Sequence, residues 1–371
     1  MIAREWGRIG VTGFGGPPAH VALLRRLCVQ RHRWMSGEEF AEANAACGLL
    51  PGPASTQLAL YCARRVGGVT GALVGGIAFI APGLGLIIAL AALFLTGHPP
   101  TWVRGAGAGA GAAVAAVAVR AGLGIVAPAW AGLGGSRSVR ARFVAYAALG
   151  AVAAAAFGPY VVVALLACGV VEVAIVARPG QEFRALAAPL LAVGKGGLAA
   201  LAWTAFKVGA LSYGGGFVIV PLMRHDAVDA YHWLSSQGFS TAIALGQVTP
   251  GPVVLTVAAV GYAAHGLAGV ALATVVAFAP SFAFVIVGGA RFDRLRANPT
   301  ARAFLGGAAP AAAGAILGAA VPLAGALREP WQALVLAAVC IALASRRAGV
   351  VTTLVGAGVV GAAVAVAGGA V

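Results

Sequence analysis

Long apolar runs alternate with short polar loops along this chain, and the runs have no polar face. Five of them contain no Asp, Glu, Lys or Arg: 69–96, 143–171, 248–290, 303–327 and 348–371. One helix needs about 20 apolar residues to cross a bilayer core. The pattern therefore predicts an all-α integral membrane protein. In the first half, the spans we predict lie at about 69–96, 105–128, 143–157 and 159–177.

The second half of the chain repeats the first at a distance of 199 residues. Under this shift Gly10 aligns with Gly209, Trp34 aligns with Trp233, and the Pro-Gly-Pro triplet at 51–53 aligns with a second at 250–252. A repeat of this length indicates duplication of a whole structural unit. We predict an N-terminal transporter repeat at 1–178, a cytoplasmic linker at 179–195 and a C-terminal repeat at 196–371.

The distribution of basic residues predicts how the two repeats are oriented. The net charge of +15 comes from basic residues spread over short loops, which indicates membrane topology and not binding to nucleic acid. Where a loop of one half is basic its counterpart is not: Arg64 and Arg65 align with Ala263 and Ala264. Equivalent loops are therefore expected on opposite faces, as in an inverted-topology repeat.

Inversion requires an odd number of crossings in each half. We predict about five spans plus one re-entrant helical hairpin per half. In the first half, segment 6–24 is expected to cross, and segment 37–63 is expected to be the hairpin, with the Pro-Gly-Pro triplet at its tip.

The two Pro-Gly-Pro triplets are the strongest candidates for a binding site. Proline ends one helix and starts another, and at membrane depth such a break is tolerated where it lines a cavity or is buried in protein. The helices that begin at Pro53 and Pro252 present free N–H groups and the positive ends of their dipoles. Two such ends that converge from opposite faces would form an anion site.

The candidate substrate-binding residues are the two breaks, nearby polar side chains, glycines of the first segment of each half, and Lys207. They are Gly15, Gly16, Pro51, Gly52, Pro53, Ser55, Thr56, Gln57, Lys207, Gly214, Gly215, Gln247, Thr249, Pro250, Gly251, Pro252 and Thr256. Arg8, which aligns with Lys207, is the accessory cation. The alternatives are that the glycines serve helix packing and that the cations extend to lipid head groups. Glu172 is a lone intramembrane carboxylate and the default candidate for a proton carrier.

No catalytic or metal-binding motif is evident, and no cofactor is expected. Only 9% of the residues are charged, and the five cysteines have neither metal-ligand nor disulfide spacing. No paired carboxylates, His-Glu-x-x-His, serine elbow or phosphate loop occur.

The motifs at 14–20, 33–36, 49–59, 209–217 and 244–253 resemble those of the chromate ion transporter family. The resemblance implies a multi-pass protein of the bacterial inner membrane that exports chromate, confers chromate resistance and recognises sulfate as an analogue. A homodimer is left open. Tyr213, where phenylalanine is commoner, and the polar Ser55-Thr56 pair depart from the family pattern and concern substrate preference.

Two other functions are kept as alternatives. The first is a transporter or channel for sulfate or another oxyanion. The second, from a different class, is a polytopic membrane enzyme that acts on anionic lipid head groups, with the breaks holding phosphate.

Overall fold

The computed structural model describes residues 1–49, 52–95, 99–134, 136–176, 196–212, 219–288, 298–345 and 348–371, and every regular element in these ranges is helical. The first half contains α1 (Ile2–Thr12), α2 (Pro17–Arg25), η1 (Arg26–Arg31), α3 (Gly37–Leu49), α4 (Ala54–Phe94), α5 (Thr101–Gly132), α6 (Arg137–Ala156), η2 (Gly158–Tyr160) and α7 (Val161–Val176). The second half contains α8 (Gly197–Leu211), α9 (Ile219–Arg224), η4 (His225–Ala230), α10 (Ser236–Val248), η5 (Val253–Leu255), α11 (Thr256–Gly288), α13 (Pro299–Ala324), α14 (Pro330–Ala344) and α15 (Val350–Val366). The prediction of an all-α protein is confirmed.

Five segments among the described residues are long and apolar enough to cross a membrane: α4, α5, α6, the segment Val253–Gly288 and α13. α4 and α11 are each two helices joined at a kink. The backbone is non-helical at Gly67 and Gly68 in α4, and at His265 and Gly266 in α11. The predicted span at 69–96 is thus the second part of α4, and those at 105–128, 143–157 and 159–177 correspond to α5, α6 and α7.

Segment 6–24, which we expected to cross the membrane, reverses direction. It is split into α1 and α2, and Arg31 at the end of η1 forms a 3.0 Å ion pair with Glu5 near the start of α1. The chain therefore folds back on itself. The cause is the same as at the triplets, since glycines at 13, 15 and 16 followed by Pro17 and Pro18 end one helix and begin the next. In this half, the described residues form two segments that fold back, where one was predicted to fold back and the other to cross.

Segment 37–63 folds back as predicted. Arg65, just beyond its second arm, lies 3.5 Å from Glu39 in the first turn of α3. Ser36 and Glu39 also cap α3 reciprocally: the Ser36 N–H donates to Glu39 Oε2 at 2.8 Å and the Glu39 N–H donates to Ser36 Oγ at 3.0 Å.

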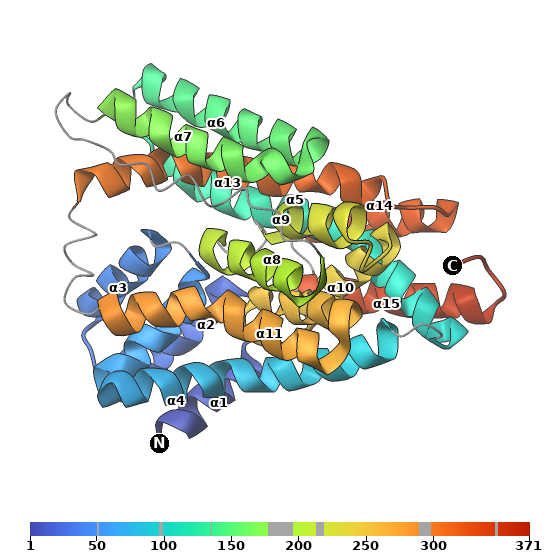
Figure 1. Ribbon diagram of the computed structural model, residues 1–371, viewed down its shortest axis with the longest axis horizontal. Helices are drawn as coiled ribbons and strands as arrows, with labels where there is room; N and C mark the ends of the chain where they lie inside the picture. Colours follow the sequence, from blue (N-terminus) through green and yellow to red (C-terminus); the bar gives the residue numbers. More distant parts are fainter. Residues whose placement is uncertain are drawn as a thin grey trace.

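The helices pack in two groups, and each group takes elements from both halves. α1 packs on α4, α8 on α11, and α4 on α11; α6 and α7 pack on α13, and α15 packs on α5. Figure 1 shows α6, α7 and α13 at one edge of the molecule and α1, α4 and α11 at the opposite edge. Small residues allow the close approach: Gly105 and Gly109 of α5 lie directly against the backbone of Gly361 and Ala357 in α15. The glycine-rich stretch 105–111 thus forms a helix interface.

The repeats at 1–178 and 196–371 are units of sequence, and their helices interleave in space. The predicted linker at 179–195, together with Pro51, Gly214 and Gly215, lies outside the described residues.

Candidate functional site

Both Pro-Gly-Pro triplets interrupt the helices as predicted. α3 ends at Leu49 and α4 begins at Ala54, while α10 ends at Val248 and η5 begins after Pro252. Gly52 and Gly251 have φ angles of +115° and +98°, which other residues adopt only with strain. The glycine in each triplet is therefore required by the backbone conformation of the break.

Two buried hydroxyl groups at the first break, and a third that follows α8, have no hydrogen-bond partner among the described residues. They belong to Thr56, Ser212 and Ser281, each of which is completely buried. A Cβ on Gly52 would lie 3.1 Å from Ser281 Oγ and 3.3 Å from the Gly209 carbonyl oxygen, so α8 and α11 of the other half enclose this break. Buried polar groups normally have partners, and unpaired ones mark a place where a ligand or water can bind.

Ser55, also at the first break, is not free to bind a substrate. His20 Nε2 lies 2.9 Å from the Gly13 carbonyl oxygen, and His20 Nδ1 lies 3.2 Å from Ser55 Oγ. Because a carbonyl only accepts, Nε2 of the neutral ring donates to it and Nδ1 accepts the Ser55 hydroxyl proton. Through these two hydrogen bonds His20 joins the first break to the glycine loop before α2.

The second break differs chemically from the first, although the sequences are related. Thr249 Oγ1 donates to the Gly246 carbonyl oxygen at 3.1 Å, and Thr256 Oγ1 donates to that of Val253 at 2.8 Å. The Gly251 N–H donates to the Gly13 carbonyl oxygen of the other half at 3.1 Å. These predicted donors are already in use, so the two breaks do not form a symmetrical pair of anion-binding ends.

A cavity of about 400 Å³ adjoins the second break. It brings together three predicted residues, Gly15, Gly16 and Gln247, and the buried Nε2 atom of Gln247 has no hydrogen-bond partner among the described residues. The remaining lining residues are Pro17, Pro18, Val117, Arg120, Ala121, Gly124, Ile125, Val253 and Val350. Concave sites with a few converging polar groups are where small ligands bind.

Arg120 is the one ionisable residue that lines this cavity in the described part of the chain, and the sequence interpretation missed it. Its Nη1 donates to the Leu343 carbonyl oxygen of α14 at 2.9 Å. An arginine inside the predicted apolar span 105–128 was itself a signal, since intramembrane charges usually serve function.

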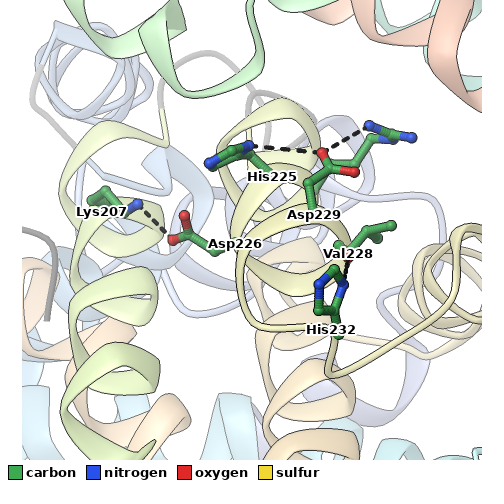
Figure 2. A network of polar contacts seen from close by, with 7 residues as sticks. Lys207, His225, Asp226, Val228, Asp229 and His232 are labelled. Atoms are coloured by element: carbon green, nitrogen blue, oxygen red, sulfur yellow. Dashed lines mark hydrogen bonds and ion pairs between the residues drawn. The ribbon is translucent and has the colours of Figure 1, made fainter. Parts of the chain in front are cut away.

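The two cations that the sequence interpretation did select lie elsewhere. Arg8 is exposed on α1 and does not line this cavity. Lys207 on α8 forms a 2.6 Å ion pair with Asp226 of η4, whose Oδ2 atom also accepts the Thr204 hydroxyl at 2.5 Å. Figure 2 shows Lys207 and Asp226 pointing toward each other from neighbouring helices, with His225 and Asp229 forming a separate contact. Lys207 is therefore neutralised by a carboxylate, which the sequence pattern did not reveal.

Glu172 is likewise paired. Its carboxylate accepts from Arg142 Nε at 2.9 Å, from Arg142 Nη2 at 3.1 Å and from the Tyr146 hydroxyl at 2.9 Å. These bonds join α6 to α7 and make Glu172 a structural contact in this conformation.

Comparisons with known proteins agree over nearly the whole chain. The family model described as chromate transporter matches residues 1–173 and 199–362. A chromate transport protein of Cupriavidus metallidurans is 30% identical over 330 residues, covering 85% of this chain and 80% of the relative. A probable chromate transport protein of Synechococcus elongatus is 28% identical, with coverage of 87% and 84%. A chromate transport protein of Pseudomonas aeruginosa is 29% identical, with coverage of 85% and 79%. No solved structure gives a significant match.

Proposed function

The chain belongs to the chromate transporter family, and from this premise we propose that it exports chromate across the bacterial inner membrane and so confers chromate resistance. Membership makes it a multi-pass membrane transport protein and not an enzyme. This excludes the alternative of an enzyme acting on lipid head groups. A transporter of sulfate or another oxyanion remains the second candidate, because these anions share the shape and charge of chromate.

The observation that carries the proposal is the cavity beside the second break. It has one cation, Arg120, one unpaired amide, Gln247, and no carboxylate among its described lining residues. This combination suits a tetrahedral oxyanion, which needs several donors to replace its hydration shell. The unpaired hydroxyls of Thr56 and Ser281 at the first break are the next donors available to it.

We further propose that the two repeats are inverted and that transport proceeds by alternating access between their broken segments. One contact supports this orientation: Arg64 Nη1 donates to the Val285 carbonyl oxygen at 2.6 Å. Arg64 lies next to the kink at Gly67 and Gly68, whereas Val285 lies 19 residues after Gly266, about 28 Å along a helix. The kinks of the two halves are thus separated by the length of a membrane span.

Correcting segment 6–24 changes the count on which inversion depends. In the first half, the second part of α4 and then α5, α6 and α7 give four crossings, and the two broken segments return to the face they left. An inverted second half therefore requires Val176 and Gly197 to lie on opposite faces, which is incompatible with the wholly cytoplasmic linker predicted from the sequence.

The direction follows from electrostatics. A dianion that leaves a cell with a negative interior moves down the membrane potential by about 4–5 kcal/mol per 100 mV. Export therefore needs no coupled ion. The pairing of Glu172 with Arg142 is in keeping with this, because it leaves no free carboxylate there to carry a proton.

Transport by the purified protein in proteoliposomes tests the proposal. Vesicles loaded with buffer, with an inside-positive potential applied, should accumulate chromate from outside through molecules whose cytoplasmic face is outward. Competition by sulfate, molybdate and phosphate ranks the substrates. Accumulation of sulfate without chromate would favour the second candidate, and accumulation of neither would reject both.

A further inference from the structure

Arg120 is the one cation that lines this cavity among the described residues, and its partner is a backbone carbonyl, as is that of Arg64 in α4. Arg142 is paired with Glu172 and Lys207 with Asp226, whereas the one described contact of Arg120 is its hydrogen bond to the Leu343 carbonyl oxygen. A carbonyl group does not cancel the positive charge. Arg120 also lies 12 residues, about 18 Å, before the end of α5. The Arg120 side chain is exposed, and an ionisable residue within an apolar span usually serves function.

The groups around Arg120 in the cavity are suited to an anion. Gln247 Nε2 is buried without a partner, and Gly15 and Gly16, with φ angles of +96° and +74°, bring their backbone to the cavity wall just before α2. A guanidinium group has five N–H donors in a planar fork, so the bond to Leu343 leaves donors free for two oxyanion oxygens.

The position of the cavity indicates the side from which the anion arrives. Val350 is the first residue of α15, which follows Arg346 and Arg347 in the chain, and Ile125 lies in the last third of α5, which ends shortly before Arg137. At the other end of the cavity, Gly16 precedes α2 and Val253 follows the second break. A Cβ on Gly16 would lie 3.6 Å from Val253 Cγ2. The cavity thus runs from the end of the helices toward the second break.

Resting on the proposed function, we propose that Arg120 is the residue that captures the transported dianion, in a cavity open to the cytoplasmic face. Leu343 holds the guanidinium over the cavity through one donor, and the anion binds to the rest, to Gln247 and to the glycine loop. A single uncompensated charge attracts a dianion about twice as strongly as a monoanion of the same size. Arg120 therefore sets the preference for doubly charged tetrahedral oxyanions.

The alternative role for Arg120 is to cap the C-terminus of α14. Leu343 lies in the last turn of that helix, and an arginine there stabilises the helix dipole. The two roles differ in what a substitution changes. A cap stabilises the protein whatever the ligand, whereas a ligand-binding cation changes affinity according to ligand charge.

The test compares Arg120→Gln, Arg120→Lys and wild type, with Arg104→Gln as the matched control on the same helix outside the cavity. Half-saturating chromate concentration is measured in proteoliposomes, and competition by sulfate is compared with competition by perchlorate, a singly charged tetrahedral anion of similar size. We expect Arg120→Gln to raise the half-saturating concentration roughly tenfold or more, the loss typical of a hydrogen bond to a charged group. It should weaken sulfate competition more than perchlorate competition. Arg120→Lys should keep the preference for sulfate at reduced affinity, and Arg104→Gln should match wild type.

Equal weakening of sulfate and perchlorate competition, or unchanged chromate affinity in Arg120→Gln, would overturn the inference. Equilibrium binding of sulfate to the purified proteins, measured by calorimetry, separates this failure from failure of the proposed function. If wild type binds sulfate through Arg120 but moves no chromate, the capture site stands and chromate export does not. If wild type moves chromate and Arg120→Gln does so with the same affinity, chromate export stands and the capture site does not.

Discussion

Thr56 is the residue at the first break whose side chain is most available to a substrate. Its hydroxyl is completely buried and has no partner among the described residues, whereas the hydroxyl of Thr256 at the second break donates to the Val253 carbonyl oxygen. We expect Thr56→Val, which keeps the shape and removes the donor, to lower chromate transport several-fold at normal membrane abundance. The loss of one neutral hydrogen bond, about 0.5–1.5 kcal/mol, sets this scale.

Thr256→Val is the matched control for Thr56→Val. It should lower the initial rate of chromate accumulation less than Thr56→Val does, because the Thr256 hydroxyl already donates to the Val253 carbonyl oxygen. A greater loss in Thr256→Val than in Thr56→Val would place the substrate at the second break alone.

Lys207 and Asp226 give a second residue-scale prediction. Their side chains are 12% and 9% exposed, and removing one member leaves a buried charge unpaired, at a typical cost of about 3–5 kcal/mol. Lys207→Met should therefore reduce the amount of folded protein, measured as the monodisperse fraction in detergent. The double variant Lys207→Met/Asp226→Leu should restore it.

The same pair distinguishes a structural role for Lys207 from the substrate role expected from the sequence. If the ion pair only joins α8 to η4, the double variant also transports chromate with wild-type affinity. Restored folding with lost affinity for chromate would return Lys207 to the binding site.

The sequence predicted a role in the site for residues that belong to motifs, but not for isolated residues. Gly15, Gly16 and Gln247 came from sequence patterns, and the structure places all three in one cavity. Asp226 aligns with Leu27 in the repeat, so comparison of the halves gave no reason to pair it with Lys207. Arg120 was visible as a charge in an apolar run, but its place beside Gln247 depends on packing between α5 and α10, which no local pattern encodes.

At the scale of elements, run length predicted the spans and turn chemistry predicted the breaks. None of α5, α6 and α7 contains a break that reverses the chain, so their limits followed within about six residues. The crossing predicted for segment 6–24 was wrong because its glycines and prolines indicate a break but not whether the chain continues or reverses beyond it. The Glu5–Arg31 contact that closes it joins residues whose proximity hydrophobicity does not reveal.

The break at Gly52 gives an element-scale prediction. Its φ of +115° is strained for any residue with a Cβ, and that atom would lie 2.7 Å from Gln57 Nε2. Gly52→Val should abolish chromate transport by displacing the start of α4, while the chain still inserts in the membrane. The control is Gly48→Val on α3 of the same hairpin, where a Cβ meets nothing within 4 Å and transport should persist. Full transport by Gly52→Val would show that the break does not position the substrate.

At the scale of the whole molecule, the interleaving of the two halves explains why repeat boundaries did not reveal the packing. α4 of the first half packs on α11 of the second, and α6 packs on α13. Each half thus supplies one side of both helix groups. The site between the breaks accordingly needs both halves, because the Gly251 N–H bonds to Gly13 and the wall around Gly52 comes from Gly209 and Ser281.

Inversion of the halves leads to the last prediction, which concerns the faces on which the kinks lie. Arg65 follows the hairpin at 37–63 and His265 is at the kink of α11, and both are exposed. The Arg64–Val285 contact and the length of the second part of α11 separate them by about one membrane thickness.

Single cysteines are placed at Arg65 and His265 in a background without Cys340, the one exposed native cysteine in the described chain. An impermeant maleimide applied to intact cells should label His265→Cys, and the same reagent applied to inside-out vesicles should label Arg65→Cys. Cysteines at Val176 and Gly197 should likewise report opposite faces. Labelling of Arg65→Cys and His265→Cys from one side would make the halves parallel, and the substrate would then have to pass between two hairpins that open on the same face.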